Sequence, residues 1–170
     1  MENKANVEIE RKYVIEKPSV EKMRACDGYT SSEIVQIYLT SPAGITRRIR
    51  SRVYPDRTLY FETSKVRIDN ISSHEYERKI DKAEFDSLSR LADPARSPII
   101  KTRHTFAYSN QLFEIDVYPE WEHTCIMETE LETRDTEVKM PDFIHIIAEV
   151  TGDKRYSNAS MSRKFPEESI

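Results

Sequence analysis

One short run near the N-terminus, Glu8-Ile9-Glu10-Arg11-Lys12, limits what this chain can fold into. Successive side chains of a β-strand point to opposite faces, so Glu8, Glu10 and Lys12 share one face of such a strand. Two carboxylates and an ammonium group make a poor surface for an apolar core. The same three groups are well suited to hold a divalent metal ion together with a phosphate group.

The alternation of charged and apolar side chains recurs along the chain. The later alternating charged residues are Arg48, Arg50 and Arg52; Glu75 and Glu77; Lys101 and Arg103; Glu114 and Asp116; and Glu128, Glu130 and Glu132. A single half-charged strand usually faces water. Repeated runs of both signs, several with apolar residues opposite, indicate instead a sheet whose charged faces gather on one side.

Strand-like segments dominate the sequence. We expect strands near residues 6–15, 34–40, 45–53, 58–67, 73–80, 99–107, 111–118 and 125–133. If their apolar faces, such as that of Val7 and Ile9, pack under helices, their charged faces point inward. About eight strands joined by short turns predict an α+β fold: an eight-stranded antiparallel β-barrel, or tunnel, with a charged lumen and a few flanking helices.

Four helices are expected outside the strands. They are a short one from Pro18 to Cys26, one that begins at a capping box of Asp81 and Glu84, one from Pro141 to Gly152, and a last one within residues 157–164. The third is predicted from the helical spacing of Phe143, Ile146, Ile147 and Val150. Ser157 or Asn158 is the expected N-cap of the last.

The composition bounds the class of protein. The 170 residues suffice for one domain with a real core, so we expect a single domain over residues 1–170, with its core at about 6–162. The net charge of −4, with Lys and Arg nearly matched by acids, argues against a nucleic-acid partner. We expect a cytoplasmic protein with no membrane partner, because the sequence has neither a secretory signal nor a membrane span. Cys26 and Cys125 are expected to be free thiols.

A charged lumen of this kind favours phosphoryl chemistry. Arg and Lys bind phosphate oxygens, and clustered carboxylates bind Mg²⁺ or Mn²⁺, which share their ligand shells with substrate phosphates. Competing motifs are absent: the chain has no Gly-Lys-Ser/Thr phosphate loop, no nucleophile elbow and only three glycines. Its four histidines have no metal-ligand spacing.

The ordered series of charged motifs resembles that of the CYTH superfamily, the triphosphate tunnel metalloenzymes. The matching motifs are Glu8-x-Glu10-x-Lys12, Arg48-Ile49-Arg50, Thr63-Ser64-Lys65, Glu75-Tyr76-Glu77, Lys101-Thr102-Arg103, Glu114-Ile115-Asp116, Glu128-Thr129-Glu130 and the ending at residues 149–158. The resemblance covers roughly residues 6–162 and is greatest to the small bacterial branch. It implies an eight-stranded antiparallel tunnel that binds a linear triphosphate and uses Mg²⁺ or Mn²⁺.

The resemblance also assigns roles to individual residues. The phosphate-binding residues would be Lys12, Arg48, Arg50, Lys65, Lys101 and Arg103, and the metal ligands would be Glu8, Glu10, Asp116, Glu128 and Glu130. The catalytic residues would be Glu128, Glu130 and Lys12, with one of the two carboxylates helping to deprotonate the attacking water. Glu75, Glu77 and Glu114 are secondary candidates, and Glu62, Glu132, Arg52 and Arg67 are weaker ones.

One position departs from the family pattern. Many small bacterial members have an Arg two residues before the first acid of the paired-acid strand, where this chain has Ser73. The loss of a basic contact there would weaken the binding of longer or terminal phosphates. Arg67 is a candidate to compensate for it.

The expected function is that of an inorganic triphosphatase, which cleaves tripolyphosphate to pyrophosphate and phosphate, because the compact chain leaves little for a nucleobase pocket. One alternative is a class IV-type adenylyl cyclase or a nucleoside or thiamine triphosphatase, in which Trp121, Tyr118 or Tyr38 would stack on the organic ring. Another is a non-catalytic module that binds polyphosphate. In each case the partner is a small-molecule phosphate chain. A homodimer is one way to cover the outer apolar strand faces.

Overall fold

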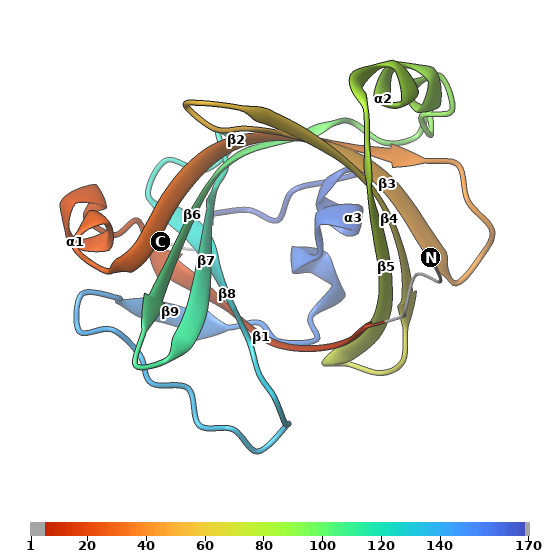
Figure 1. Ribbon diagram of the computed structural model, residues 1–170. Coiled ribbons are helices and arrows are strands. Elements are labelled where there is room, and N and C mark those ends of the chain that lie inside the picture. The colour runs from red at the N-terminus through yellow and green to blue at the C-terminus, as the bar shows by residue number, and fades with distance from the viewer. Residues whose placement is uncertain (1–5, 169–170) are drawn as a thin grey trace.

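The structure, a computed structural model, describes residues 6–168 as a ring of strands with helices around and inside it (Figure 1). The strands are β1 (Asn6–Glu16), β2 (Asp27–Leu39), β3 (Ile45–Val53), β4 (Thr58–Arg67), β5 (Ser72–Ile80), β6 (Ile99–Tyr108), β7 (Gln111–Val117), β8 (Thr124–Glu130) and β9 (Ile146–Glu149). The helices are α1 (Val20–Arg24), α2 (Lys82–Ser89), α3 (Asn158–Met161) and the 3₁₀ turn η1 (Lys154–Tyr156).

The strands β1 to β8 close into a barrel. Their order around the ring is β5-β4-β3-β2-β6-β7-β8-β1, and β1 closes the ring by pairing with β5. Every pairing is antiparallel. The first part of β1 pairs with β5, at Val7 opposite His74, and the rest pairs with β8, so the strands are staggered around the ring. The predicted antiparallel barrel is confirmed.

The third predicted helix is wrong. Part of that segment forms β9, which pairs with β1 over Tyr13 to Ile15. This part of β1 extends past the end of β5, and β9 supplies hydrogen-bond partners to a backbone edge that would otherwise lack them. Ile146 and Ile147, predicted to share an apolar helix face, are 46 % and 38 % exposed. The sheet therefore has a ninth strand, and β2 also begins earlier than predicted, at Asp27.

The other three helices are confirmed, and α2 and α3 begin at predicted capping residues. The Ser19 hydroxyl accepts a hydrogen bond from a first-turn N–H of α1 at 3.4 Å. The Asp81 carboxylate accepts from the Glu84 N–H at 2.8 Å, and the Ser157 hydroxyl accepts from the Ser160 N–H at 3.1 Å. These bonds satisfy N–H groups that the first turn of a helix leaves without partners.

Two apolar clusters cover the outside of the barrel. One lies beneath α1 and residues 138–144 and contains Tyr13, Ile15, Met23, Phe106, Phe113, Ile115, Cys125, Met127 and Ile144. The other lies beneath α2 around Leu39, Ile49 and Ile80. Because outward apolar residues alternate with charged ones, burying them turns the charged residues inward. The expectation for Val7 is wrong: 57 % of this side chain is exposed.

A third cluster fills one end of the barrel from the inside. Its members, from the strands, their loops and the C-terminal segment, are Val14, Tyr38, Ile99, Tyr118, Trp121, Ile126, Val150, Tyr156 and Met161. Figure 1 shows α3 within the ring of strands. Arg96 holds this segment by donating to the Ala159 carbonyl and to the Ser162 hydroxyl. We call this side of the lumen, lined by α3, η1 and residues 40–45, the α3 end.

No helix within residues 6–168 is both long and apolar enough to cross a membrane. Cys26 and Cys125 are free thiols, as predicted. Burial raises the pKa of Cys125 to about 12, so this thiol stays protonated and belongs to the outer apolar cluster.

At Gly152 the loop after β9 lies close to the turn between β4 and β5. Its φ is +75°, and a Cβ added there would lie 3.0 Å from the Cβ and the carbonyl oxygen of Asn70. A left-handed backbone costs a non-glycine residue roughly 1–2 kcal/mol, and the contact with Asn70 adds to this cost. We expect Gly152→Ala to lower the free energy of unfolding in urea by more than about 2 kcal/mol.

Gly44 provides the matched control, because its φ is +81° and an added Cβ would meet nothing within 4 Å. Gly44→Ala should show only the conformational part of the loss. Equal losses in the two variants would contradict a role for the contact with Asn70.

Candidate active site in the barrel lumen

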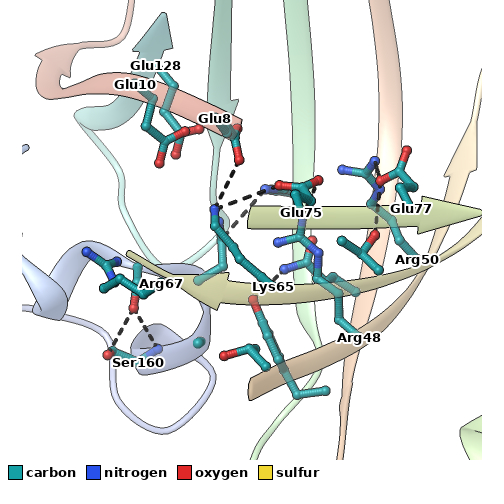
Figure 2. A pocket seen from close by; sticks show the side chains of 18 of the residues that line it. Glu8, Glu10, Arg48, Arg50, Lys65, Arg67, Glu75, Glu77, Glu128 and Ser160 are labelled. Atoms are coloured by element: carbon teal, nitrogen blue, oxygen red, sulfur yellow. Dashed lines mark hydrogen bonds and ion pairs between the residues drawn. The ribbon is translucent and has the colours of Figure 1, made fainter. Parts of the chain in front are cut away.

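A cavity of about 900 Å³ occupies the inside of the barrel. Its wall is formed largely by the inward-facing residues of successive strands, as the alternation predicts. The charged strand residues of the wall are Glu8, Glu10, Lys12, Arg48, Arg50, Arg52, Lys65, Arg67, Glu75, Glu77, Lys101, Arg103, Glu114, Glu128 and Glu130. Figure 2 shows Glu10 and Glu128 on one side of the cavity and Lys65 and Arg48 on the other. Of the predicted phosphate and metal residues, Asp116 alone lies outside this wall.

Most cations of the wall are paired with a carboxylate. The pairs, with their N–O distances, are Lys12–Glu128 at 3.0 Å, Lys65–Glu8 at 3.4 Å, Arg50–Glu77 at 3.3 Å, Arg48–Glu75 at 3.9 Å and Arg103–Glu114 at 2.5 Å. The secondary candidates Glu75, Glu77 and Glu114 are therefore counter-ions of cations predicted to bind phosphate. Such pairs limit the cost of removing charges from water, and a bound polyanion can take over the same cations.

Glu8, Glu10 and Glu130 form a crowded group of carboxylates. Burial, a hydrogen bond with Glu75 and nearby acids raise the pKa of Glu8 to about 7. Burial and the Glu128 charge raise the pKa of Glu10 to about 8, and burial and the Glu8 charge raise that of Glu130 to about 7. Like charges in one site disfavour ionisation. Near neutral pH this group therefore holds protons when no cation is bound.

Glu128 lies beside this group and behaves differently. Burial alone would raise the pKa of Glu128, but Lys12 and the cations of β6 lower it to about 2. The Lys12 ammonium also donates to the Tyr156 carbonyl oxygen at 3.2 Å, which ties it to the C-terminal segment. Glu128 is therefore an ionised partner of Lys12 and a weak proton acceptor.

Asp116, Lys101 and Arg103 form a buried cluster at the edge of the lumen. One Asp116 oxygen accepts from Lys101 Nζ at 2.8 Å and from Arg103 Nη2 at 2.9 Å, and the other accepts from Arg103 Nε at 2.7 Å. Burial would raise the pKa of Asp116, but these two cations hold it well below its usual range. Burial lowers the pKa of Lys101 to about 8. Asp116, predicted as a metal ligand, thus has both oxygens engaged in orienting two predicted phosphate-binding side chains.

The comparisons with known proteins agree with this geometry. No protein-family model matches the sequence. The chain is similar to two proteins named inorganic triphosphatase. The one from Nitrosomonas europaea is 32 % identical over 133 residues, which are 77 % of this chain and 84 % of the relative. The one from Acetivibrio thermocellus is 33 % identical over 117 residues, or 68 % and 71 % of the two chains. The chain belongs to the CYTH superfamily, the triphosphate tunnel metalloenzymes.

A solved structure of the same family shows that the likeness extends to the whole fold. The crystal structure of the inorganic triphosphatase NE1496 has a TM-score of 0.59 and 30 % sequence identity to this chain. The match covers 94 % of this chain and 96 % of that one. The tunnel described above is therefore the triphosphate tunnel fold.

Membership in the triphosphate tunnel family raises the question of whether this lumen fits a divalent metal ion. Within residues 6–168, no three His, Cys, Asp or Glu side chains are arranged to hold an ion. The donor set nevertheless fits one: the predicted ligands other than Asp116 line one cavity, and the buried Glu8 Oε2 has the Lys65 ammonium 3.4 Å away as its ion-pair partner but makes no closer hydrogen bond within residues 6–168. Crowded, buried carboxylates gain most from a cation. Side-chain rotation and phosphate oxygens from a substrate would complete the ligand set.

The weaker candidates divide between the tunnel and its outside. Arg52 and Arg67 line the cavity. Glu62 faces outward, where it pairs with Arg47 at 2.9 Å, and the exposed Glu132 lies beyond the end of β8. Neither Glu62 nor Glu132 belongs to the site.

Sequence reasoning missed uncharged residues of the site. Gln36 is fully buried in the cavity wall and donates to the Tyr38 hydroxyl at 2.6 Å. Asn158 accepts from the Tyr118 hydroxyl at 2.7 Å and from the Lys101 ammonium at 3.5 Å. Gln36 left a signal, because it is a polar residue between apolar neighbours of a predicted strand. Apart from the motif at residues 149–158, no sequence signal indicated that Asn158 belongs to the site, because its position depends on the C-terminal segment lying inside the barrel.

Proposed function

We propose that this protein hydrolyses inorganic tripolyphosphate to pyrophosphate and orthophosphate in the lumen of the barrel. One observation carries the proposal: cations and crowded carboxylates line the same cavity of about 900 Å³. A linear triphosphate needs both, because cations hold its oxygens and carboxylates hold the metal ions that neutralise it. The names of the two relatives described above support the inorganic substrate.

The cations of the wall bind and orient the phosphate chain. Arg48 and Arg50 come from β3 and Lys65 from β4, while Lys101 and Arg103 come from β6. Arginine forks match pairs of phosphate oxygens, and lysine ammonium groups act as point charges. Asp116 keeps the β6 pair in position for this task.

The carboxylates would bind the metal ion, and one of them would accept a proton from the attacking water. Mg²⁺ or Mn²⁺, held by Glu8, Glu10, Glu128 and Glu130, would neutralise phosphate charge and acidify a water molecule when bound. Of the two carboxylates predicted as the base, we favour Glu130. Lys12, 3.0 Å away, lowers the pKa of Glu128 to about 2, whereas Glu130 has no ion-pair partner within residues 6–168 that would hold it in the same way.

The organic-triphosphate alternative is disfavoured by the surroundings of its proposed stacking residues. Tyr118 and Trp121 are 1 % and 3 % exposed and belong to the apolar cluster at the α3 end. Tyr38 is 3 % exposed, and the Arg96 guanidinium lies 5.3 Å from the centroid of its ring. A ring could stack on Tyr118 or Trp121 only if Tyr156 and Phe165 of the C-terminal segment, which pack against them, moved away. A non-catalytic phosphate-binding module, in turn, would not need the crowded carboxylates.

A comparison of substrates tests the proposal. Orthophosphate and cyclic AMP are measured side by side from tripolyphosphate, ATP and thiamine triphosphate, with Mg²⁺ or Mn²⁺ and with a chelator. Metal-dependent release from tripolyphosphate at the highest kcat/KM supports the proposal. Formation of cyclic AMP, or turnover of an organic triphosphate alone, would replace it with the corresponding alternative.

Metal binding by the lumen should strengthen as the pH rises. A cation must displace protons from Glu8, Glu10 and Glu130, whose pKa values are raised to about 7, about 8 and about 7. Below these values the protonated carboxylates compete with the metal, and above them they attract it. We expect Mn²⁺ affinity, measured by calorimetry without substrate, to rise at least about tenfold from about pH 6 to about pH 9. An affinity independent of pH would contradict this assignment of ligands.

A further inference from the structure

Arg67 differs from most other cations of the cavity wall because it has no carboxylate partner. Within residues 6–168, the wall cations that form ion pairs are Lys12, Arg48, Arg50, Lys65, Arg96, Lys101, Arg103 and Arg163. Arg52, Arg67 and Lys154 line the same cavity and form none among these residues. Arg52 donates to the Ser32 hydroxyl at 2.7 Å.

The contacts of the Arg67 guanidinium are weak. Its Nη1 donates to the carbonyl oxygens of Asp69 and Asn70, at 3.4 Å in each case. Hydrogen bonds of this length lie beyond the usual range for N–H donors. A guanidinium carries five N–H donors, so most of this capacity is left for a ligand.

Arg67 lies at the α3 end of the lumen. On β4, Lys65 is 3.4 Å from Glu8, and Arg67 follows two residues later, roughly 7 Å further along the strand. On β5 the inward acids end at Glu75, and the next inward residue is Ser73, which pairs with Arg67. Figure 2 shows the same order, with Glu75 away from α3 and Arg67 beside it.

A small cavity opens beside Arg67. It measures about 30 Å³, and three cations from two strands, Lys12, Lys65 and Arg67, line it together with Ser73. The acids of the lining are Glu10 and Asp153. Ser73 is 5 % exposed and faces the lumen between β4 and β1. Because its side chain is short, the Arg67 guanidinium has room to turn into the lumen.

We propose that Arg67, with Lys12 and Lys65, forms the subsite for the phosphate group at the α3 end of a linear phosphate chain. The inference rests on the proposed function, since it assumes such a chain in the lumen. A terminal phosphate carries more negative charge than a bridging one, and a planar guanidinium binds two of its oxygens at once. Arg67 thereby supplies from β4 the cation that Ser73 does not supply from β5.

Calorimetric binding of tripolyphosphate, without metal and therefore without turnover, tests the subsite. The proteins compared are the wild type, Arg67→Gln and Arg90→Gln. Arg90 ends α2 on the outside of the barrel and is exposed, so its replacement removes one positive charge without touching the lumen. Loss of a charge-assisted contact should weaken the binding of tripolyphosphate by Arg67→Gln about tenfold or more. Arg90→Gln should stay within about twofold of the wild type.

The outcomes separate this subsite from the proposed hydrolysis. Arg67→Gln within about twofold of the wild type, or Arg90→Gln weakened as much as Arg67→Gln, would overturn the subsite. A wild type that does not bind tripolyphosphate would overturn it as well. A wild type that binds but does not hydrolyse tripolyphosphate with metal would overturn the proposed function, while a selective loss in Arg67→Gln would still support the subsite.

Discussion

The Glu10→Gln variant should release phosphate from tripolyphosphate at least about 100-fold more slowly than the wild type. Burial and the neighbouring Glu128 charge raise the pKa of Glu10 to about 8, so this carboxyl group is mostly protonated near neutral pH in the metal-free lumen. A metal ion that displaces the proton would gain a negatively charged ligand. Glutamine keeps the shape of the side chain but cannot supply this charge, and a metal ligand supports several kcal/mol of transition-state stabilisation.

The control for this prediction is Glu21→Gln, which removes an exposed carboxylate from α1 on the outside of the barrel. Phosphate release is measured at saturating tripolyphosphate and Mg²⁺ or Mn²⁺. Because glutamine resembles a protonated glutamate, Glu10→Gln should also unfold at a temperature close to that of the wild type. A variant that folds and keeps the wild-type rate would contradict the role assigned to Glu10.

Asp116→Ala should lower the free energy of unfolding by about 3–5 kcal/mol. Asp116 is 1 % exposed, and its two oxygens accept one hydrogen bond from Lys101 and two from Arg103. Removing it leaves Lys101, also 1 % exposed, without its carboxylate, and leaves Arg103 with Glu114 alone. An uncompensated buried charge costs far more than the loss of an exposed pair. Urea denaturation followed by circular dichroism measures the change.

Asp86→Ala is the matched control, because Asp86 also pairs with a lysine, Lys82 at 2.7 Å, but on the exposed face of α2. Its loss should change the free energy of unfolding by no more than about 1 kcal/mol. Similar losses in the free energy of unfolding for the two variants would contradict the role of Asp116 as the buried counter-ion of Lys101 and Arg103.

The barrel was predictable from sequence because strand alternation is a local property. In β7, Phe113 and Ile115 can pack in the outer apolar cluster only if Glu114 and Asp116 point to the opposite, inner face of the strand. The predicted bounds of β3 and β4 agree with the structure, and their lumen-lining cations Arg48, Arg50, Arg52, Lys65 and Arg67 are spaced two residues apart within each strand. The same alternation placed almost all charged site residues on the cavity wall.

The parts that were not predicted depend on partners distant in the sequence. Ile146 and Ile147 have helical spacing with Phe143 and Val150, but they form β9 because this segment pairs with the edge of β1 that extends beyond β5. The role of Asp116 depends on register, because it lies directly opposite Arg103, whose charge it neutralises. Local pattern cannot supply either fact, since both follow from which strands become neighbours.

The most direct test of the proposed hydrolysis follows tripolyphosphate itself by phosphorus NMR in water enriched with oxygen-18, with the wild type and Mg²⁺ or Mn²⁺. Attack of water on a terminal phosphorus breaks its anhydride bond, so the label enters orthophosphate and the leaving group is unlabelled pyrophosphate. We expect equal amounts of the two products, with the label in orthophosphate alone. Tripolyphosphate that stays intact would contradict the proposed hydrolysis.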